Sequence, residues 1–188
     1  KEEFMNVAVL GSGSWATALA KIVMHNVAEI NWYIRKQETI DEFREIRRNP
    51  NHLEWAYFDI SRINFSNDIN QVLSEAELVI LAVPSPYVKD VLAEITVDMS
   101  QKKVISAVKG MIPGDNILVT DYMHQHFHVP EANLGMITGP CHAEEIALER
   151  LSYLTIGCKD TANATEWKKL FDTPYVRTTP SNDMKGLE

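Results

Sequence analysis

The sequence predicts an α/β fold built on a mostly parallel, doubly wound sheet with helices on both faces. Short apolar runs alternate with longer amphipathic stretches along nearly the whole chain, which is the pattern of repeated strand–helix–strand units. A glycine-rich turn directly after the first apolar run is a second indication, because such turns join a buried strand to a helix in this class of fold. The 188 residues, 45% of them hydrophobic, suffice for one substantial core.

The elements follow from the length of each apolar run and from the turn residues that bound it. Strands are expected at residues 6–10, 31–34, 78–82, 103–108, 133–138, 153–157 and 175–178. Helices are expected between them, at 15–25, 38–48, 68–75, 87–95, 115–126, 142–148 and 161–171. Residues 49–66 begin with Asn49-Pro50-Asn51 and have weak periodicity, so we expect a loop that crosses over to a short strand.

Composition narrows the class of protein. The formal net charge of −8 argues against nucleic acid or an anionic membrane as the main partner, because such surfaces need clustered Lys and Arg. No apolar run is long enough for membrane insertion, and the acidic start does not resemble a signal peptide. The two cysteines, Cys141 and Cys158, are not spaced as a metal or redox pair. A soluble protein of the reducing cytoplasm is therefore expected.

The first strand is followed by a turn of the pattern G-x-G-x-x-A. This turn is made of Gly11-Ser12-Gly13-Ser14-Trp15-Ala16. Gly11 permits the tight turn, Gly13 lets a pyrophosphate approach the backbone, and Ala16 keeps the helix close to the strand. An ordinary glycine-rich turn is the alternative, but its place at the first strand–helix junction favours dinucleotide binding.

The end of the second strand bears on the choice between NADPH and NADH. A carboxylate there would accept hydrogen bonds from the ribose of NAD, yet Arg35-Lys36 follows the strand and the first acid is Glu38. Two adjacent cations suit the 2′-phosphate of NADP, and Arg35 is also able to stack on the adenine. A solvated pair of cations at a strand end is the alternative interpretation.

Ligands in an open parallel sheet sit beyond the carboxyl ends of the strands. Pro84 follows the third apolar strand, and Tyr87 is placed to pack on the nicotinamide side of the cofactor or simply to begin a helix. Lys109 follows the next strand, where the reactive end of a dinucleotide would meet a small substrate. A solvated lysine is the weaker alternative.

The sequence predicts neither a catalytic nor a metal-binding role for the histidines discussed below. His142 stands at the expected start of a helix, and no carboxylate is placed by the sequence to orient it as a general base, so a surface or packing role is expected. His124, His126 and His128 alternate, but no cysteine or carboxylate completes a ligand set, so no metal site is expected.

Four groups of residues occur in a characteristic order and spacing: residues 7–20, Val83-Pro84-Ser85, Val108-Lys109-Gly110, and residues 139–145. Together they resemble the amino-terminal, Rossmann-type domain of NAD(P)-dependent glycerol-3-phosphate dehydrogenase, over nearly the whole chain. The resemblance implies that a cofactor, NADPH or NADH, contacts Ser14, Trp15, Arg35 and Ala143. It also implies that Lys109, the catalytic candidate of this chain, touches cofactor and substrate, and that Gly139 and Cys141 line the glycerol-phosphate site.

Two departures accompany the resemblance. The family more often has Ser or Thr where Cys141 stands, so a weaker thiol contact or the backbone would replace a hydroxyl hydrogen bond. Residues 182–188 resemble the segment before the family's catalytic lysine, which is expected about two helical turns further on. We expect residues 1–180 to form the cofactor-binding domain and residues 181–188 to begin a helical substrate domain, with Ser181, Asn182 or Asp183 as its cap.

The implied reaction of the full-length enzyme is reduction of dihydroxyacetone phosphate to sn-glycerol 3-phosphate, which supplies glycerophospholipid synthesis. A homodimer of the full-length protein is compatible with this function. The 188 residues alone are expected to be inactive, because the catalytic lysine lies beyond them. The alternatives are another dehydrogenase of the ketopantoate reductase or hydroxyacyl-CoA dehydrogenase type, and a dinucleotide-sensing module without turnover; Lys109-Gly110 with Gly139-Pro140 disfavours the two other dehydrogenases.

Overall fold

The computed structural model describes residues 5–139 and 142–183. Over these residues it contains an eight-stranded sheet in the order β10-β9-β8-β5-β4-β1-β2-β3. Its strands are β1 (Val7–Leu10), β2 (Ile30–Tyr33), β3 (Ile63–Ser66), β4 (Leu78–Leu81), β5 (Lys103–Ser106), β8 (Leu134–Thr138), β9 (Ser152–Cys158) and β10 (Val176–Ser181). Neighbouring strands pair in parallel, except that β9 is antiparallel to β8. The predicted mostly parallel sheet is confirmed.

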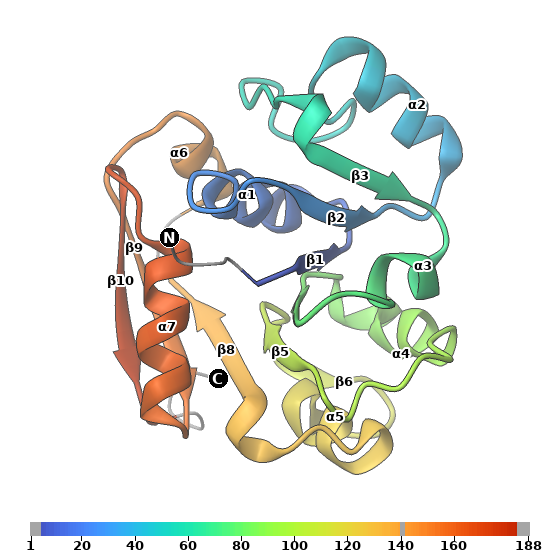
Figure 1. Ribbon diagram of the computed structural model, residues 1–188, viewed down its shortest axis with the longest axis vertical. Coiled ribbons are helices and arrows are strands. Elements are labelled where there is room, and N and C mark those ends of the chain that lie inside the picture. Colours follow the sequence, from blue (N-terminus) through green and yellow to red (C-terminus); the bar gives the residue numbers. More distant parts are fainter. Residues whose placement is uncertain (1–4, 140–141, 184–188) are drawn as a thin grey trace.

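Helices cover both faces of the sheet (Figure 1), as predicted. On one face lie α1 (Ser14–Val23), α2 (Gln37–Ile46), α6 (Ala143–Ala147) and α7 (Thr161–Phe171). On the other lie α3 (Ile69–Leu73), α4 (Ser85–Ala93) and α5 (Val119–Phe127). The chain order reverses between β1 and β4, which is the topological switch point where dinucleotides bind in Rossmann-type sheets.

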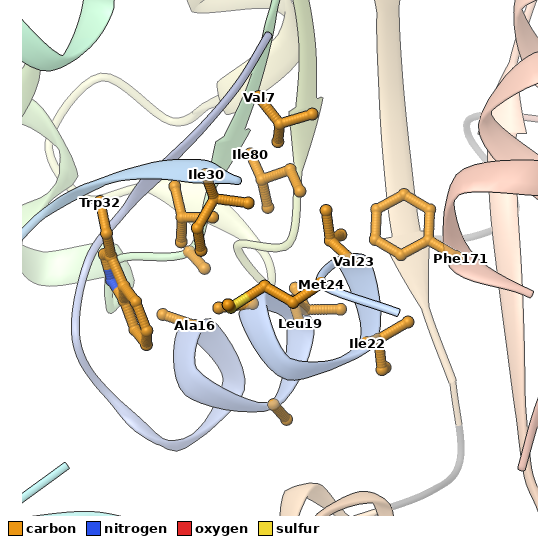
Figure 2. Close-up of a cluster of buried hydrophobic side chains, with 14 of the residues drawn as sticks. Val7, Ala16, Leu19, Ile22, Val23, Met24, Ile30, Trp32, Ile80 and Phe171 are labelled. Atoms are coloured by element: carbon orange, nitrogen blue, oxygen red, sulfur yellow. The ribbon is translucent and has the colours of Figure 1, made fainter. Parts of the chain in front are cut away.

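The described residues form two hydrophobic core clusters, one on each face of the sheet. Val7 and Val9 of β1 point into one cluster, whereas Ala8 and Leu10 point into the other. A strand buried on both faces needs apolar residues at every position, which is why β1 and β4 are unbroken apolar runs. Figure 2 shows α1 in the first cluster, with Trp32 at the end of the helix that carries Ala16 and Phe171 near Val23.

Residues 111–118 differ from the prediction. The helix expected at residues 115–126 begins only at Val119, and before it β6 (Met111–Ile112) and β7 (Ile117–Leu118) form a small antiparallel hairpin. Gly114 has φ +91° and Asn116 has φ +53°, and backbone in this left-handed region does not continue a helix.

The crossing loop forms as predicted, whereas the last described residues extend the sheet. Residues 49–66 cross over as expected and end in a short 3₁₀ helix, η1 (Ile60–Arg62), followed by β3 at the edge of the sheet. Ser181, one of the expected helix caps, instead ends β10, where it pairs with Gly157 of β9. Its hydroxyl does accept a hydrogen bond from the N–H of Asp183 at 3.1 Å. Residues 184–188 lie outside the described residues.

Candidate functional site

The glycine-rich turn lies at the switch point, between the carboxyl ends of β1 and β4. Gly11 has φ +115°, and a Cβ atom built on it would lie 2.4 Å from the carbonyl oxygen of Ala82. No side chain fits at that distance, so glycine at position 11 is what lets the turn pack against the backbone that follows β4.

Gly13 has a different reason to be glycine. It precedes α1 with φ −76° and ψ −172°, a conformation open to any residue, and a Cβ atom there would meet nothing within 4 Å. Protein packing therefore does not demand glycine at this position. The open space lies at the N-terminus of α1, where N–H groups and the helix dipole favour an anion. The turn thus fits a pyrophosphate, which a side chain at position 13 would displace.

The other residues of the turn take two kinds of place. Ser14 is the first residue of α1, and its hydroxyl oxygen lies 3.1 Å from Nδ1 of His52. Ala16 is fully buried in the core between α1 and the sheet, in keeping with the need for a small residue there. Trp15 is partly buried and packs against the core.

A pocket of about 170 Å³ opens beside the turn. Among the described residues, three segments line it: Trp15 after β1, residues 107–110 after β5, and residues 136–139 at the carboxyl end of β8. Lys109 is exposed in its wall, and Gly110 turns the chain there with φ +77°. The structure therefore brings together Trp15, Lys109 and Gly139, which lie far apart in the sequence.

The two cations after β2 are exposed at the same edge of the sheet. Arg35 follows the strand, and Lys36 immediately precedes α2. Within the part of the chain that the structure describes, neither side chain forms an ion pair. Both are thus available to an anionic ligand.

The remaining predicted site residues lie outside this pocket or outside the described residues. Pro84 caps α4 from its N-terminal side, and Tyr87 in the first turn of that helix has an exposed fraction of 59%. Ala143 is buried at the start of α6, which contacts α1. His142, for which no chemistry is predicted, is exposed just before α6. Cys141 falls outside the described residues.

The sequence prediction missed the residues whose side chains donate hydrogen bonds to the carbonyl groups of the turn. Asn49 is 1% exposed and donates a hydrogen bond to the carbonyl oxygen of Ser12 at 2.9 Å. The indole of Trp32 donates to the carbonyl oxygen of Gly11 at 2.7 Å. The dipeptide Asn49-Pro50 signalled a turn, but no pattern in the sequence indicated which residues its side chain would contact.

The alternating histidines have separate surroundings. Nδ1 of His124 lies 2.8 Å from the carbonyl oxygen of Val129, and the ring of His126 stacks on Tyr122 at 4.1 Å between centroids. Over residues 5–139 and 142–183, no group of three His, Cys, Asp or Glu side chains is arranged to hold a metal ion. Nor does any helix within these ranges have the length and apolarity to cross a membrane.

Comparison with known proteins identifies the family. Residues 6–164 match the family described as the N-terminus of NAD-dependent glycerol-3-phosphate dehydrogenase. The chain belongs to this family. Its cofactor is accordingly NADH or NADPH, and the resemblance seen in the sequence is confirmed.

Relatives named glycerol-3-phosphate dehydrogenase match nearly the whole of this chain. The NAD(P)+ enzyme of Oceanobacillus iheyensis is 30% identical over 184 residues, which are 97% of this chain and 53% of that protein. The structure of the Plasmodium falciparum enzyme superposes with a TM-score of 0.86 at 29% identity, covering 96% of this chain and 53% of that one. The Saccharomyces cerevisiae enzyme superposes with a TM-score of 0.85 at 20% identity, covering 98% and 58%. The chain therefore spans about half the length of the relatives it matches.

Proposed function

We propose that this chain is the cofactor-binding half of an enzyme that reduces dihydroxyacetone phosphate to sn-glycerol 3-phosphate with NADH or NADPH. The observation that carries the proposal is the pocket shared by Trp15, Lys109 and Gly139 next to the glycine-rich turn. The relatives named glycerol-3-phosphate dehydrogenase support the choice of substrate.

The residues of the chain would divide the work of binding. The turn and the start of α1 hold the pyrophosphate through backbone N–H groups, while Arg35 and Lys36 meet the adenosine end. The cofactor supplies a hydride when bound. The ammonium group of Lys109 would attract the anionic substrate and polarise its carbonyl group, and Trp15 lines the same pocket.

Further roles belong to the same proposal. Gly139 and Cys141 would line the subsite for the glycerol phosphate, Ala143 would lie against the cofactor, and Pro84 and Tyr87 would border its nicotinamide side. Residues 1–180 would form the cofactor-binding domain, with a helical substrate domain beginning at 181–188 and supplying the catalytic lysine. A cytoplasmic enzyme without a nucleic-acid partner or membrane insertion agrees with the charge and composition. It would feed glycerophospholipid synthesis, and a homodimer of the full-length protein is compatible with this function.

Steady-state kinetics of the full-length protein test the proposal. We expect oxidation of NADH or NADPH that depends on dihydroxyacetone phosphate, and a loss of about 10²–10⁴ in kcat/KM in Lys109→Ala. Ketopantoate and acetoacetyl-CoA serve as competing substrates. Turnover of either of these instead, or cofactor binding with no turnover of any of the three, would contradict the assignment.

A further inference from the structure

Three consecutive carbonyl oxygens of the glycine-rich turn each accept a hydrogen bond from a side chain outside the turn. Trp32 donates through Nε1 to Gly11 at 2.7 Å, and Asn49 donates through Nδ2 to Ser12 at 2.9 Å. The hydroxyl of Thr17 donates to Gly13 at 2.7 Å. The C=O and N–H groups of a trans peptide unit point in opposite directions. Holding these three carbonyl groups therefore turns the N–H groups of residues 12, 13 and 14 the other way.

Asn49 is the member of this set that belongs to neither the sheet nor α1. It comes from the loop before η1, is 1% exposed, and uses both ends of its amide. Nδ2 donates to the Ser12 carbonyl and, at 2.9 Å, to Oγ1 of Thr17. Oδ1 accepts from the N–H groups of Asn51 at 2.9 Å and His52 at 3.2 Å. One buried side chain thus orders its own loop and fixes the central peptide unit of the turn.

We propose that Asn49 is a positioning residue for the cofactor pyrophosphate, acting through the Ser12–Gly13 peptide unit. A buried amide with all its hydrogen bonds made has one favourable orientation, because any rotation leaves polar groups without partners. The N–H of Gly13 is then held toward the open space at the start of α1 before the cofactor arrives, and binding does not have to order it. The inference rests on the proposed role of the turn in cofactor binding.

The substitution Asn49→Asp separates this role from the folding of the loop. Aspartate has the same shape and keeps the acceptor for Asn51 and His52, but it replaces the two donors by a carboxylate oxygen that repels the Ser12 carbonyl. The measurements are the dissociation constants of NADH and NADPH, taken by fluorescence at a temperature where circular dichroism shows the variant folded. We expect both dissociation constants to rise by about tenfold or more. The factor should be the same for NADH and NADPH, since both carry the pyrophosphate.

Two controls exclude simpler explanations. Asn51→Asp places the same charge on the exposed side chain of a neighbour in the loop, and it is expected to change either constant less than about twofold. Lowering the pH protonates the carboxylate introduced by Asn49→Asp and restores a donor to the Ser12 carbonyl. The affinity of Asn49→Asp, relative to that of the unaltered chain at the same pH, should therefore recover as the pH falls. Because protonation also relieves the cost of burying a carboxylate, circular dichroism must show both chains fully folded at every pH at which affinity is compared.

The partner Thr17 gives an independent test if Asn49→Asp fails to fold. Thr17→Val removes the hydroxyl within nearly the same volume and should lower the affinity for both cofactors. Thr17→Ser keeps the hydroxyl and should retain that affinity. Wild-type affinity in Asn49→Asp or Thr17→Val, an equal loss in Asn51→Asp, or a loss confined to NADPH would each overturn the positioning role. An unaltered chain that binds neither cofactor would instead overturn the proposed function of the turn.

Discussion

A side chain added to the turn is expected to lower folding stability at Gly11 but cofactor affinity at Gly13. In Gly11→Ala the new Cβ would stand 2.4 Å from the carbonyl oxygen and 3.0 Å from the carbonyl carbon of Ala82. Both are backbone atoms in the segment that follows a central strand, and φ is +115°, so strain and overlap add. We expect the free energy of unfolding to fall by about 3–5 kcal/mol, a large part of the roughly 5–15 kcal/mol typical of a domain.

Gly13→Val should leave that free energy within about 1 kcal/mol of its original value. A Cβ there meets no atom within 4 Å, and the position before a helix tolerates other residues at a cost of about 1 kcal/mol. The branched side chain fills the space in which a pyrophosphate would meet the backbone. Because charge-assisted hydrogen bonds are each worth about 1.5–3 kcal/mol, we expect cofactor affinity to fall by about a hundredfold or more.

Urea denaturation followed by circular dichroism measures the first quantity, and cofactor fluorescence measures the second. Both variants are measured beside the unaltered chain, so each serves as the control for the other. Undiminished binding by Gly13→Val would remove the turn from the cofactor site. Undiminished stability of Gly11→Ala would refute the close approach of the turn to Ala82.

Three further predictions concern cofactor choice, turnover and pH. Arg35→Ala should weaken NADPH by about fivefold to tenfold and leave NADH unchanged, because one charge-assisted contact to the 2′-phosphate is lost; equal losses in titrations of both cofactors would contradict this. The 188 residues tested alone should bind NADPH yet not oxidise it with dihydroxyacetone phosphate, since they span only about half the length of the relatives and the proposed substrate domain would be missing from the assay; activity equal to that of the full-length protein would refute it. Burial, and then the carboxylate of Glu94 3.3 Å away, raises the pKa of Tyr33 above 10.0. Because the pKa of Tyr33 is higher in the folded than in the unfolded chain, its contribution to stability is present below the unfolded-state pKa and is lost as the pH rises. Folding stability should therefore fall above about pH 10, and it should fall less in Tyr33→Phe. Identical alkaline denaturation curves for the two chains would refute this role of Tyr33.

The sheet was predictable because its central strands are buried on both faces. Leu78–Leu81 has no exposed position, so the run is wholly apolar and easy to recognise. The hairpin of β6 and β7 was missed because each strand has only two residues, too few to show a period. Pro113-Gly114 was the available signal, since this dipeptide favours a turn over a continuing helix.

Convergence of the site residues was also predictable, and for a topological reason. Parallel strands end at one edge of the sheet, so segments that follow β1, β5 and β8 must approach one another wherever those strands are near neighbours. Trp15, Lys109 and Gly139 meet in one pocket for this reason. Asn49 was not predictable, because its loop has no period and its partner Ser12 is 37 residues away.

An aromatic cluster surrounds the indole of Trp32 that donates a hydrogen bond to the turn. Trp32 packs on Phe43, Phe58 and Phe65 with ring centroids 5.2, 5.5 and 5.7 Å away, and its fully buried indole has little freedom to rotate. The hydrogen bond from Trp32 to the Gly11 carbonyl is thus held by packing rather than by an exposed loop. Since ordering a binding site before the ligand arrives reduces the entropy lost on association, substitutions in this cluster that keep the fold but loosen the indole should weaken both cofactors without contacting either.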